Sequence, residues 1–510
     1  MAKKDVTSLR GAIEYLKEIG EILVTNVETD PELEVSGIQK HFDGGSAVLF
    51  ENLKGYPDRR IVTNMYASRE RVAKIFDVDG HKNLKFKIAD AVLHPTPPKV
   101  VNDAPCQEVV ITKDIDVYSV VPVIKQTPRD PLRTLGGGNT FISGKYFWGG
   151  THVSYNRMSF RGKDYSSFQI SPGSHTDMVL KEWHGKGPIP FTVNLGVPPA
   201  VTMMAGGGFL YMFLHKGCDE LGVGGSIQGS PIEIVKARTV DAYSIAQAEY
   251  VIEGYLDTTQ HVWETPEAEE HKTQGVYPFH PEWPGYYGRA YRTYKFQATA
   301  VTHRKDRPIY YPTITHSIDD HNIDTRTREA NFWLLAESIC PGICIDTYIP
   351  KAFGDWGGVI FQFKKRMARE EGYQKNILTA ALSASMGMRI AIAVDDDINM
   401  YEPEDVLWAI TTRAEPDEDF QVVAPGSRGQ VFQPAQRARI TEKGQQWVAS
   451  AIKYAGGLAI DATAPFDVKW AFDRPLHHRV DLKKWFTDQQ IEKAKASMWP
   501  YHKFLSDSGI

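Results

Sequence analysis

The spacing of hydrophobic residues predicts a helix at the start of the chain. Leu9, Ile13 and Leu16 lie four and three positions apart, as on one face of an α-helix. A β-like run over 22–27 and a further helical segment follow. This alternation predicts an α/β domain over residues 1–115.

Short β-like runs, separated by glycine and proline, dominate the middle of the chain. They occupy 140–150, 151–160, 189–197 and 292–303. Such runs are typical of a β-barrel or sandwich, so we predict a β-rich domain over 116–322. Within it, residues 242–256 predict an inserted helix or a helix–strand pair.

Alternation of helix and strand returns in the last third of the chain. The expected elements are a helix over 328–339, a buried strand over 388–394 and a helix over 402–413. A final helix over 487–499 opens with a Thr487-x-x-Gln490 capping box. We predict a C-terminal α/β domain over 323–510, whose last helix suits docking on a neighbouring subunit.

Composition and charge narrow the functional classes. The 510 residues suggest about three domains. The 58 basic and 63 acidic side chains leave a net charge of −5, which argues against nucleic acid as the main partner. No apolar run approaches the ~20 residues of a membrane span, and the N-terminus lacks the apolar core of a secretory signal. Four cysteines indicate no disulfide framework, which fits a cytoplasmic protein.

The stretch from residue 152 to residue 220 is richest in candidate ligands. Its side chains are His152, Arg157, His175, Asp219 and Glu220. Two imidazoles and a carboxylate suit a borderline divalent metal. Because none of the spacings forms a compact metal motif, separate polar side chains are the favoured interpretation from spacing alone. The segment MMAGGG at 203–208 ends in three glycines, whose exposed backbone could be approached by a phosphate or a cation. The alternative is that these glycines simply form a turn.

A second candidate lies between Tyr277 and Arg289, where three prolines fix non-helical conformations around Glu282. A carboxyl group desolvated among the aromatic residues there would hold its proton more tightly, as a general acid requires; a surface glutamate is the equal alternative. The chain has no P-loop, no GxSxG elbow and no GxGxxG after a strand. This argues against NTP hydrolysis, α/β-hydrolase chemistry and a Rossmann dinucleotide site.

Several segments, in order, resemble the UbiD family of reversible (de)carboxylases. They are residues 8–38 with 47–57, FTVNLGVPPAV (191–201), IEIVKA (232–237), PEWPGYY (281–287) and VDDDINMYEPEDVLWAITTR (394–413). The resemblance runs from end to end. It implies an N-terminal α/β domain, a central split β-barrel that carries a flavin, and a C-terminal α/β domain for oligomerisation.

The resemblance also implies cofactors and partners. The expected cofactor is prenylated FMN, made by a separate flavin prenyltransferase. A divalent metal, typically Mn²⁺, and K⁺ are expected beside the cofactor phosphate. The chain is expected to form a homo-oligomer, either a dimer or a hexamer.

Site residues follow from the matching motifs. The implied metal ligands are His152, His175 and Glu220, with Asp219 as the fallback for Glu220; at the position of His152 the family has asparagine. The implied cofactor contacts are Val153, Ser154, Tyr155, Asn156, Arg157, Ser174, His175, Ala205, Gly206, Gly207 and Glu220.

Three positions are implied to act on the substrate. Arg157 matches the active-site arginine and is expected to hold the substrate carboxylate through two parallel hydrogen bonds. Glu282 matches the catalytic acid. Tyr277 stands where the family has a second glutamate and is expected to bind Glu282 or substrate; Glu269 or Glu270 replaces that glutamate if the chain loops back. Candidate pocket residues, with surface positions as the alternative, are His316, His321 and Lys364.

The implied function is reversible, non-oxidative decarboxylation of an aromatic acid, hydroxybenzoate-like or polycyclic, with release of CO2. One alternative is a carboxylase subunit that acts on an aromatic hydrocarbon, a phenol derivative or an aromatic acyl-CoA. The other is a flavin-binding subunit without catalytic activity.

Overall fold

The computed structural model describes residues 4–136, 139–142, 152–170, 174–207, 213–214, 219–384, 387–426, 455–475, 477–478, 480–497 and 505–506. Two compact units are present. The first contains residues 1–334 and 351–357, and the second contains 335–350, 358–426 and 456–510. The expected strand over 140–150 is therefore described only to Ile142, and Gly208 of the glycine run lies outside the described residues.

A four-stranded sheet forms the N-terminal part of the first unit. Its order is β1 (Ile22–Thr25), β2 (Ala47–Phe50), β3 (Arg60–Thr63) and β17 (Ile309–Tyr310). Strand β2 runs parallel to β1 and antiparallel to β3, and β17 runs parallel to β3. Because β17 comes from far along the chain, this sheet is not completed by the first 115 residues.

The predicted first helix is confirmed as α1 (Leu9–Glu18), which Ser8 caps by accepting a hydrogen bond from the Gly11 N–H. Its apolar face is buried. That face belongs to a core shared with the helices of the central region, so the N-terminal segment packs as part of a larger body. The surrounding helices are α2 (Glu34–His41), α3 (Arg69–Ile75), α4 (Leu84–Leu93), α7 (Pro199–Gly206) and α8 (Glu220–Gln228).

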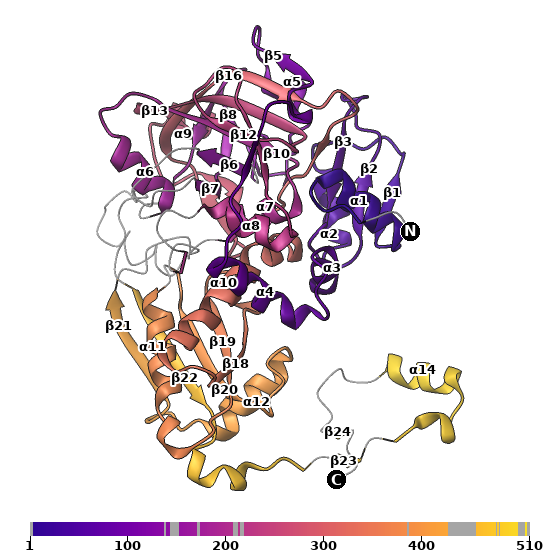
Figure 1. The fold of residues 1–510 in the computed structure, drawn as a ribbon, viewed down its shortest axis with the longest axis vertical. Helices are drawn as coiled ribbons and strands as arrows, with labels where there is room; N and C mark the ends of the chain where they lie inside the picture. The colour runs from indigo at the N-terminus through magenta and orange to yellow at the C-terminus, as the bar shows by residue number, and fades with distance from the viewer. Residues whose placement is uncertain are drawn as a thin grey trace. The chain divides into compact units, whose positions relative to one another are not determined.

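An eight-stranded sheet forms the central region (Figure 1). Its order is β7 (His152–Tyr155), β6 (Asn139–Ile142), β10 (Ile189–Leu195), β13 (Tyr250–Trp263), β16 (Arg292–His303), β9 (Tyr165–Phe168) and β8 (Met158–Phe160), and β5 (Val109–Ile111) also pairs with β16. The first and last strands of this order, β7 and β8, are consecutive in sequence. Only Asn156 and Arg157 join them, so the sheet curls back on itself without closing by hydrogen bonds, as a split barrel.

The helix predicted within 242–256 is wrong. The segment forms β12 (Tyr243–Ile245) and the start of β13, the longest strand of the central sheet. Strand β13 pairs with β10 on one side and β16 on the other, and its first residues are buried. A strand buried on both faces needs a continuous apolar run, and such a run lacks the alternation that separates strand from helix in a sequence.

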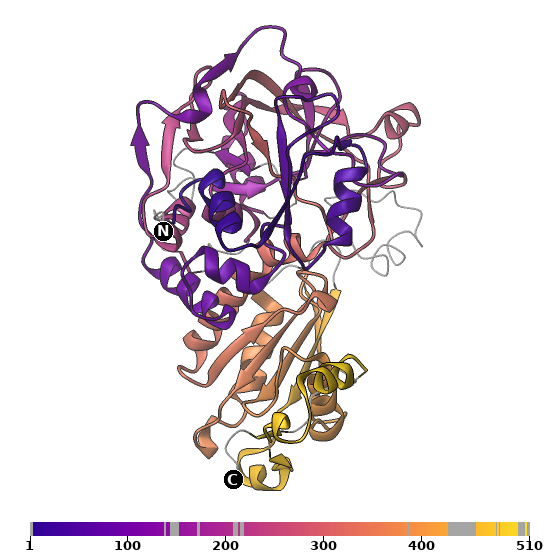
Figure 2. The same ribbon diagram turned by 90° about the vertical axis from the view of Figure 1, so that its right-hand side faces the viewer.

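The other elements of the first unit surround the central sheet, and in Figure 2 the indigo N-terminal helices lie toward the viewer. The strands are β4 (Lys99–Val101), β11 (Glu233–Lys236), β14 (Pro278–Pro281) and β15 (Tyr287–Arg289). The helices are α5 (Val117–Val120), α6 (His175–Trp183), α9 (Pro266–Glu270) and α10 (Ile318–Ile339).

The second unit is built on a five-stranded sheet. Its order is β18 (Cys344–Tyr348), β19 (Gly358–Phe363), β20 (Ile390–Asp395), β22 (Ala455–Ala462) and β21 (Phe420–Gly426). Strands β19, β20 and β22 are parallel. The predicted strand over 388–394 and helix over 402–413 are confirmed as β20 and α12 (Pro403–Arg413). This part of the chain also contains α11 (Tyr373–Ala384), β23 (His477–His478) and β24 (Leu505–Ser506).

The predicted C-terminal helix is α14 (Asp488–Ala496), and both hydrogen bonds of its Thr487–Gln490 capping box are present. Among the described residues, no helix combines the length and the apolar character that crossing a membrane requires.

Gly254 lies at an irregularity where the register between β13 and β16 shifts. A methyl group there would collide with the backbone oxygen of Gln297 and the ring of Phe296. We expect Gly254→Ala to lower the free energy of unfolding by about 1–3 kcal/mol. Gly224→Ala is the control: in α8 its methyl group would meet Met204 at an ordinary 3.4 Å, and it should stabilise by up to about 1 kcal/mol. Equal losses of melting temperature in the two variants would contradict this account.

Candidate functional site

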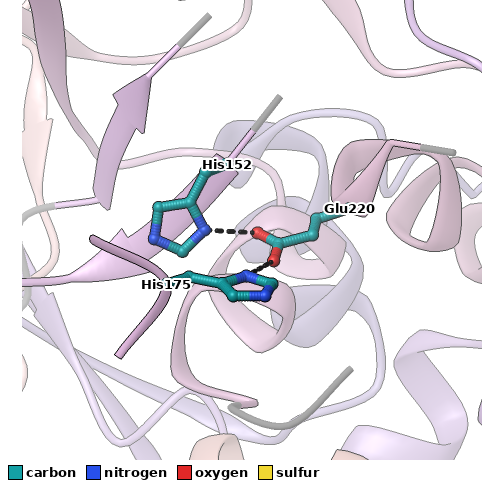
Figure 3. A group of neighbouring side chains, drawn as sticks. All are labelled: His152, His175 and Glu220. Atoms are coloured by element: carbon teal, nitrogen blue, oxygen red, sulfur yellow. Dashed lines mark hydrogen bonds and ion pairs between the residues drawn. The ribbon is translucent and has the colours of Figure 1, made fainter. Parts of the chain in front are cut away.

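Three side chains that are distant in sequence meet beside the edge strand β7 (Figure 3). His152 opens β7, His175 is the first residue of α6, and Glu220 is the first residue of α8. One carboxylate oxygen of Glu220 lies 3.0 Å from His152 Nδ1, and the other lies 2.9 Å from His175 Nδ1. The three residues named as metal ligands are therefore gathered around one carboxylate.

The electrostatics of this cluster favour an ionised glutamate. Burial by itself would raise the pKa of Glu220, but the imidazoles of His152 and His175 lower it well below its ordinary value. The backbone N–H of Val153 donates to the same carboxylate at 2.8 Å. His152 is held from its other side, since its Nε2 lies 3.0 Å from Thr176 Oγ1.

The cluster fits a divalent metal ion. One possible ligand atom from each residue lies within 4.8 Å of the others. Ligands at metal–ligand distances of about 2.0–2.2 Å lie at most about 4.4 Å apart, so small side-chain movements suffice. Two imidazoles and a carboxylate suit a transition metal better than Ca²⁺ or Mg²⁺, which prefer oxygen ligands only.

The segments named as cofactor contacts converge on the same strand. Helices α6, α7 and α8 all contact β7. This brings together Val153, Ser154, Tyr155, Asn156, Ser174, His175, Ala205, Gly206, Gly207 and Glu220. Ser174 caps α6 by accepting from the Asp177 N–H. Asp219, the fallback ligand, caps α8 instead, with its side chain 2.9 Å from the Leu221 N–H.

A second cluster lies where β7 passes into β8. Arg157 donates from Nε and Nη2 to the two carboxylate oxygens of Glu264, each at 2.9 Å. Its Nη1 donates to Glu282, and its Nη2 also donates to the Arg289 carbonyl at 3.2 Å. Burial would lower the pKa of Arg157, but the two carboxylates raise it above its ordinary value. The guanidinium is thus a fixed cation between two acids.

Glu264 is the residue that the sequence analysis missed. It follows directly on β13 and precedes Thr265, the cap of α9, and its side chain is fully buried. The alternative Glu269 is half-exposed and pairs with Arg161 at 2.9 Å. No motif in the sequence marked Glu264, and the element predicted before it ended at residue 256, seven residues short of the end of β13.

The paired arrangement changes the expectation for Arg157. Its two-pronged Nε/Nη2 edge is occupied by Glu264, so two parallel bonds from this edge to a substrate carboxylate are not available. The Nη1 side, which also faces Glu282, is the side left to meet a substrate.

Glu282 sits at the tip of the hairpin formed by β14 and β15. Its backbone N–H donates to the Tyr286 carbonyl at 2.8 Å, and its carbonyl accepts from the Gly285 N–H at 3.0 Å. Gly285 has φ +85°, which favours glycine at this turn. A methyl group on Gly288 would lie 2.6 Å from Glu282 Oε1, so the bare glycine backbone leaves room for the carboxylate.

His280, two residues before Glu282, is buried and held in one tautomer. Its Nδ1–H donates to the Pro281 carbonyl at 2.6 Å, and its Nε2 accepts from the Gln126 amide at 3.0 Å. Gln126 is fixed in turn, since its amide oxygen accepts from the Thr315 N–H. Burial and the nearby charge of Arg157 lower the pKa of His280 to about 3. The ring is therefore neutral at physiological pH.

The other named residues make contacts of their own. The Tyr277 ring stacks on His271, with centroids 5.3 Å apart, and no hydrogen bond to Glu282 is found for it among the described residues. His316 donates from Nδ1 to the Trp283 carbonyl at 3.0 Å. His321 is buried against Asp355 at 2.6 Å. Lys364 is 62% exposed and belongs to the second unit, where it pairs with Asp396.

Comparison with known protein families accounts for nearly the whole chain. Three family models match in order, all described as parts of 3-octaprenyl-4-hydroxybenzoate carboxy-lyase: the N-terminal domain over 13–91, the Rift-related domain over 99–317 and the C-terminal domain over 321–462. The chain belongs to the UbiD family. It is a carboxy-lyase with the three-part α/β architecture of that family.

Individual UbiD relatives are similar over most of their length. Gallate decarboxylase of Lactiplantibacillus plantarum is 32% identical over 478 residues, which cover 89% of this chain and 94% of the relative. The apo structure of 3,4-dihydroxybenzoic acid decarboxylase from Enterobacter cloacae is 28% identical, covers 95% of this chain and 99% of that one, and has a TM-score of 0.82. The UbiD-class enzyme HmfF from Pelotomaculum thermopropionicum in complex with FMN is 26% identical, covers 94% of this chain and 100% of that one, and has a TM-score of 0.80.

Because His280 is neutral in the folded protein, we expect the free energy of unfolding to depend on pH. Its pKa of about 3 in the folded protein lies below the ~6.5 of an unfolded chain, so between these values only the unfolded state takes up the proton. Its contribution to stability is therefore complete above about pH 6.5 and is lost as the pH falls, by up to about 1.4 kcal/mol per pH unit. We expect His280→Gln to remove this dependence.

Urea unfolding at pH 7, 6 and 5 measures the effect. The stability of wild type should fall more steeply with decreasing pH than that of His280→Gln. The exposed His94 provides the control, and His94→Gln should follow wild type. Parallel curves for wild type and His280→Gln would show that His280 does not stay neutral in the folded protein.

Proposed function

We propose that this UbiD-family chain catalyses the reversible decarboxylation of a hydroxylated aromatic carboxylic acid, with prenylated FMN bound beside a divalent metal ion. The observation that carries the proposal is the buried Glu264–Arg157–Glu282 cluster at the junction of β7 and β8. Relatives named for gallate and 3,4-dihydroxybenzoic acid support the substrate class. Relatives solved with FMN or prenylated FMN support the cofactor.

The residues proposed to hold a flavin nucleotide lie on β7 and at the ends of the helices that contact it. His152, with His175 and Glu220, would bind a metal ion, preferably Mn²⁺, and the metal would bind the cofactor phosphate. Arg157 follows five residues later, at most about 17 Å along an extended chain. One elongated ligand can therefore reach from the metal cluster to the Arg157 cluster.

When bound, the prenylated flavin supplies the electron sink that loss of CO2 from an sp² carbon requires. The protein places charged groups around the substrate and donates a proton. Arg157, held by Glu264, presents its Nη1 side to the substrate carboxylate. A substrate carboxylate adds a third negative charge around one guanidinium, which favours uptake of a proton by Glu282. Glu282 is the less buried of the two acids, with 14% of its side chain exposed against 0% for Glu264, and it donates that proton to the carbon from which CO2 has left.

Glu264 weighs against a non-catalytic role. Such a role is the alternative if Tyr277, which stands where the family has a second glutamate, leaves the site without a second acid. Because Glu264 supplies that acid from the end of β13, Arg157 has a carboxylate on each side. A cation held in this way costs stability to bury unless both partners are kept, which fits a site built for chemistry.

Replacement of the proposed acid should stop turnover and spare cofactor binding. For Glu282→Gln, in protein co-produced with a flavin prenyltransferase, we expect CO2 release from 3,4-dihydroxybenzoate or gallate to fall by about 10²–10⁴-fold. Flavin content, read from the absorbance spectrum, should match wild type. Glu269→Gln changes an exposed glutamate that pairs with Arg161 and should retain activity. Turnover at the wild-type rate in Glu282→Gln would exclude Glu282 as the proton donor.

The metal site can be tested without turnover. His175→Ala should abolish stoichiometric Mn²⁺ binding in calorimetric titration of metal-free protein, because one of three ligands is lost. His184→Ala is a matched control, since His184 is an exposed histidine at the opposite end of α6. The His175→Ala protein should also lose flavin on purification. Unchanged Mn²⁺ affinity in this variant would place the metal elsewhere.

A further inference from the structure

Three flat groups, from Trp283, Trp356 and Arg328, contact one another next to Glu282 in the β14–β15 hairpin. The ring of Trp283, the residue after Glu282, stacks on the ring of Trp356 with centroids 5.4 Å apart and planes 19° from parallel. On Trp356, the guanidinium carbon of Arg328 lies 4.4 Å from the ring centroid. Trp283 and Arg328 are buried, with 8% and 3% of their surfaces exposed. Stacked rings with a cation on one face form an attractive and strongly oriented arrangement.

Helix α10 fixes the outer part of this stack. Asp324 of this helix pairs with Arg328, one turn further along, at 3.2 Å. The carboxylate therefore fixes the guanidinium that lies on the Trp356 ring. The turn that carries Trp356 is also tied down through Asp355, which pairs with His321 of α10 at 2.6 Å.

At the other end of the stack, Trp283 belongs to the β14–β15 hairpin that carries Glu282. The carbonyl of Trp283 accepts a hydrogen bond from His316 at 3.0 Å. Gly354, beside Trp356, lies against Trp283 and Pro284, where an added methyl group would find both at 3.5–3.6 Å. The backbone after Glu282 is thus held by these contacts, while the side chain of Glu282 pairs with Arg157.

We infer that Trp356 is a positioning residue for Glu282: its stack with Trp283, held by Asp324 and Arg328, sets the hairpin so that the carboxylate meets Arg157. The inference rests on the proposed role of Glu282 as proton donor. Trp356 is not expected to touch substrate. Its loss should therefore affect proton donation and leave substrate and flavin binding close to wild type.

The test compares Trp356→Leu with Trp333→Leu. Trp333 is also a half-buried tryptophan in an aromatic contact, with Phe86, and it packs against the core that contains Leu334. The first readout is independent of activity: labelling of Glu282 by a water-soluble carbodiimide with an amine, quantified by mass spectrometry of peptides. Loss of one aromatic stack predicts a rise of about threefold to tenfold in labelling of Glu282 in Trp356→Leu. Labelling of Glu264 should not change, and Trp333→Leu should match wild type at both positions.

The second readout is steady-state kinetics of the flavin-loaded enzyme. Trp356→Leu should lower kcat by about tenfold, within the range that a small misplacement of a catalytic group produces. KM should stay within about twofold, because the groups proposed to bind substrate are retained. Trp356→Phe keeps a flat but smaller ring against Trp283, so its kcat and labelling should lie between those of wild type and Trp356→Leu. If Trp356→Leu does not fold, the Phe variant against wild type decides.

The outcomes separate this inference from the proposed function. Unchanged labelling of Glu282 in both Trp356 variants overturns the inference, even if the wild-type enzyme is an active decarboxylase. An equal rise in Trp333→Leu overturns it too, because the effect would then be one of general stability. If wild type releases no CO2 from any aromatic acid, the proposed function fails. In that case a selective rise in labelling of Glu282 still supports the positioning role.

Discussion

The structure of the site depends on burial of one positive charge. A guanidinium removed from water needs most of its five N–H groups satisfied and its charge balanced. Around Arg157, two carboxylates and a carbonyl do this, and they come from three places in the chain: the end of β13, the tip of the β14–β15 hairpin and the last residue of β15. Correct pairing of the central strands is what brings them together. Formation of the ion cluster around Arg157 therefore depends on formation of the split barrel.

Local features of the fold could be predicted from the sequence because their causes are local. The first helix, with its apolar face and serine cap, and the capping box of α14 involve residues at most seven positions apart. The C-terminal strand β20 was recognisable as a short apolar run. By contrast, the run at 250–256 was ambiguous, since burial on both faces removes the period that distinguishes a strand. What decided its conformation was pairing with β10 and β16, which lie far away in the chain.

The site was predictable only in part, for a related reason. Residue type and family resemblance were enough to name His152, His175, Glu220, Arg157 and Glu282. They could not show that Glu264 reaches Arg157, because that contact depends on how far β13 extends before α9 begins. Helix α10 is a further case: its middle residues are almost all buried although many are charged. A sequence with so little apolar character gives no sign of burial, and only tertiary partners such as Asp355 and Gly207 explain it.

Strand β17 has a consequence for how the chain is made. In the N-terminal sheet, β3 ends at Thr63, but the neighbour that covers its outer edge is formed by Ile309 and Tyr310. At a translation rate of about 5–20 residues per second, roughly 12–50 seconds pass between synthesis of the two strands. During that time the nascent chain carries an unpaired parallel edge. Until residue 228 is made, its first helices also lack the core that they later share with α7 and α8. An uncovered edge of this kind is a template for association with other chains. The N-terminal sheet can therefore be completed only after the chain has been synthesised as far as Tyr310.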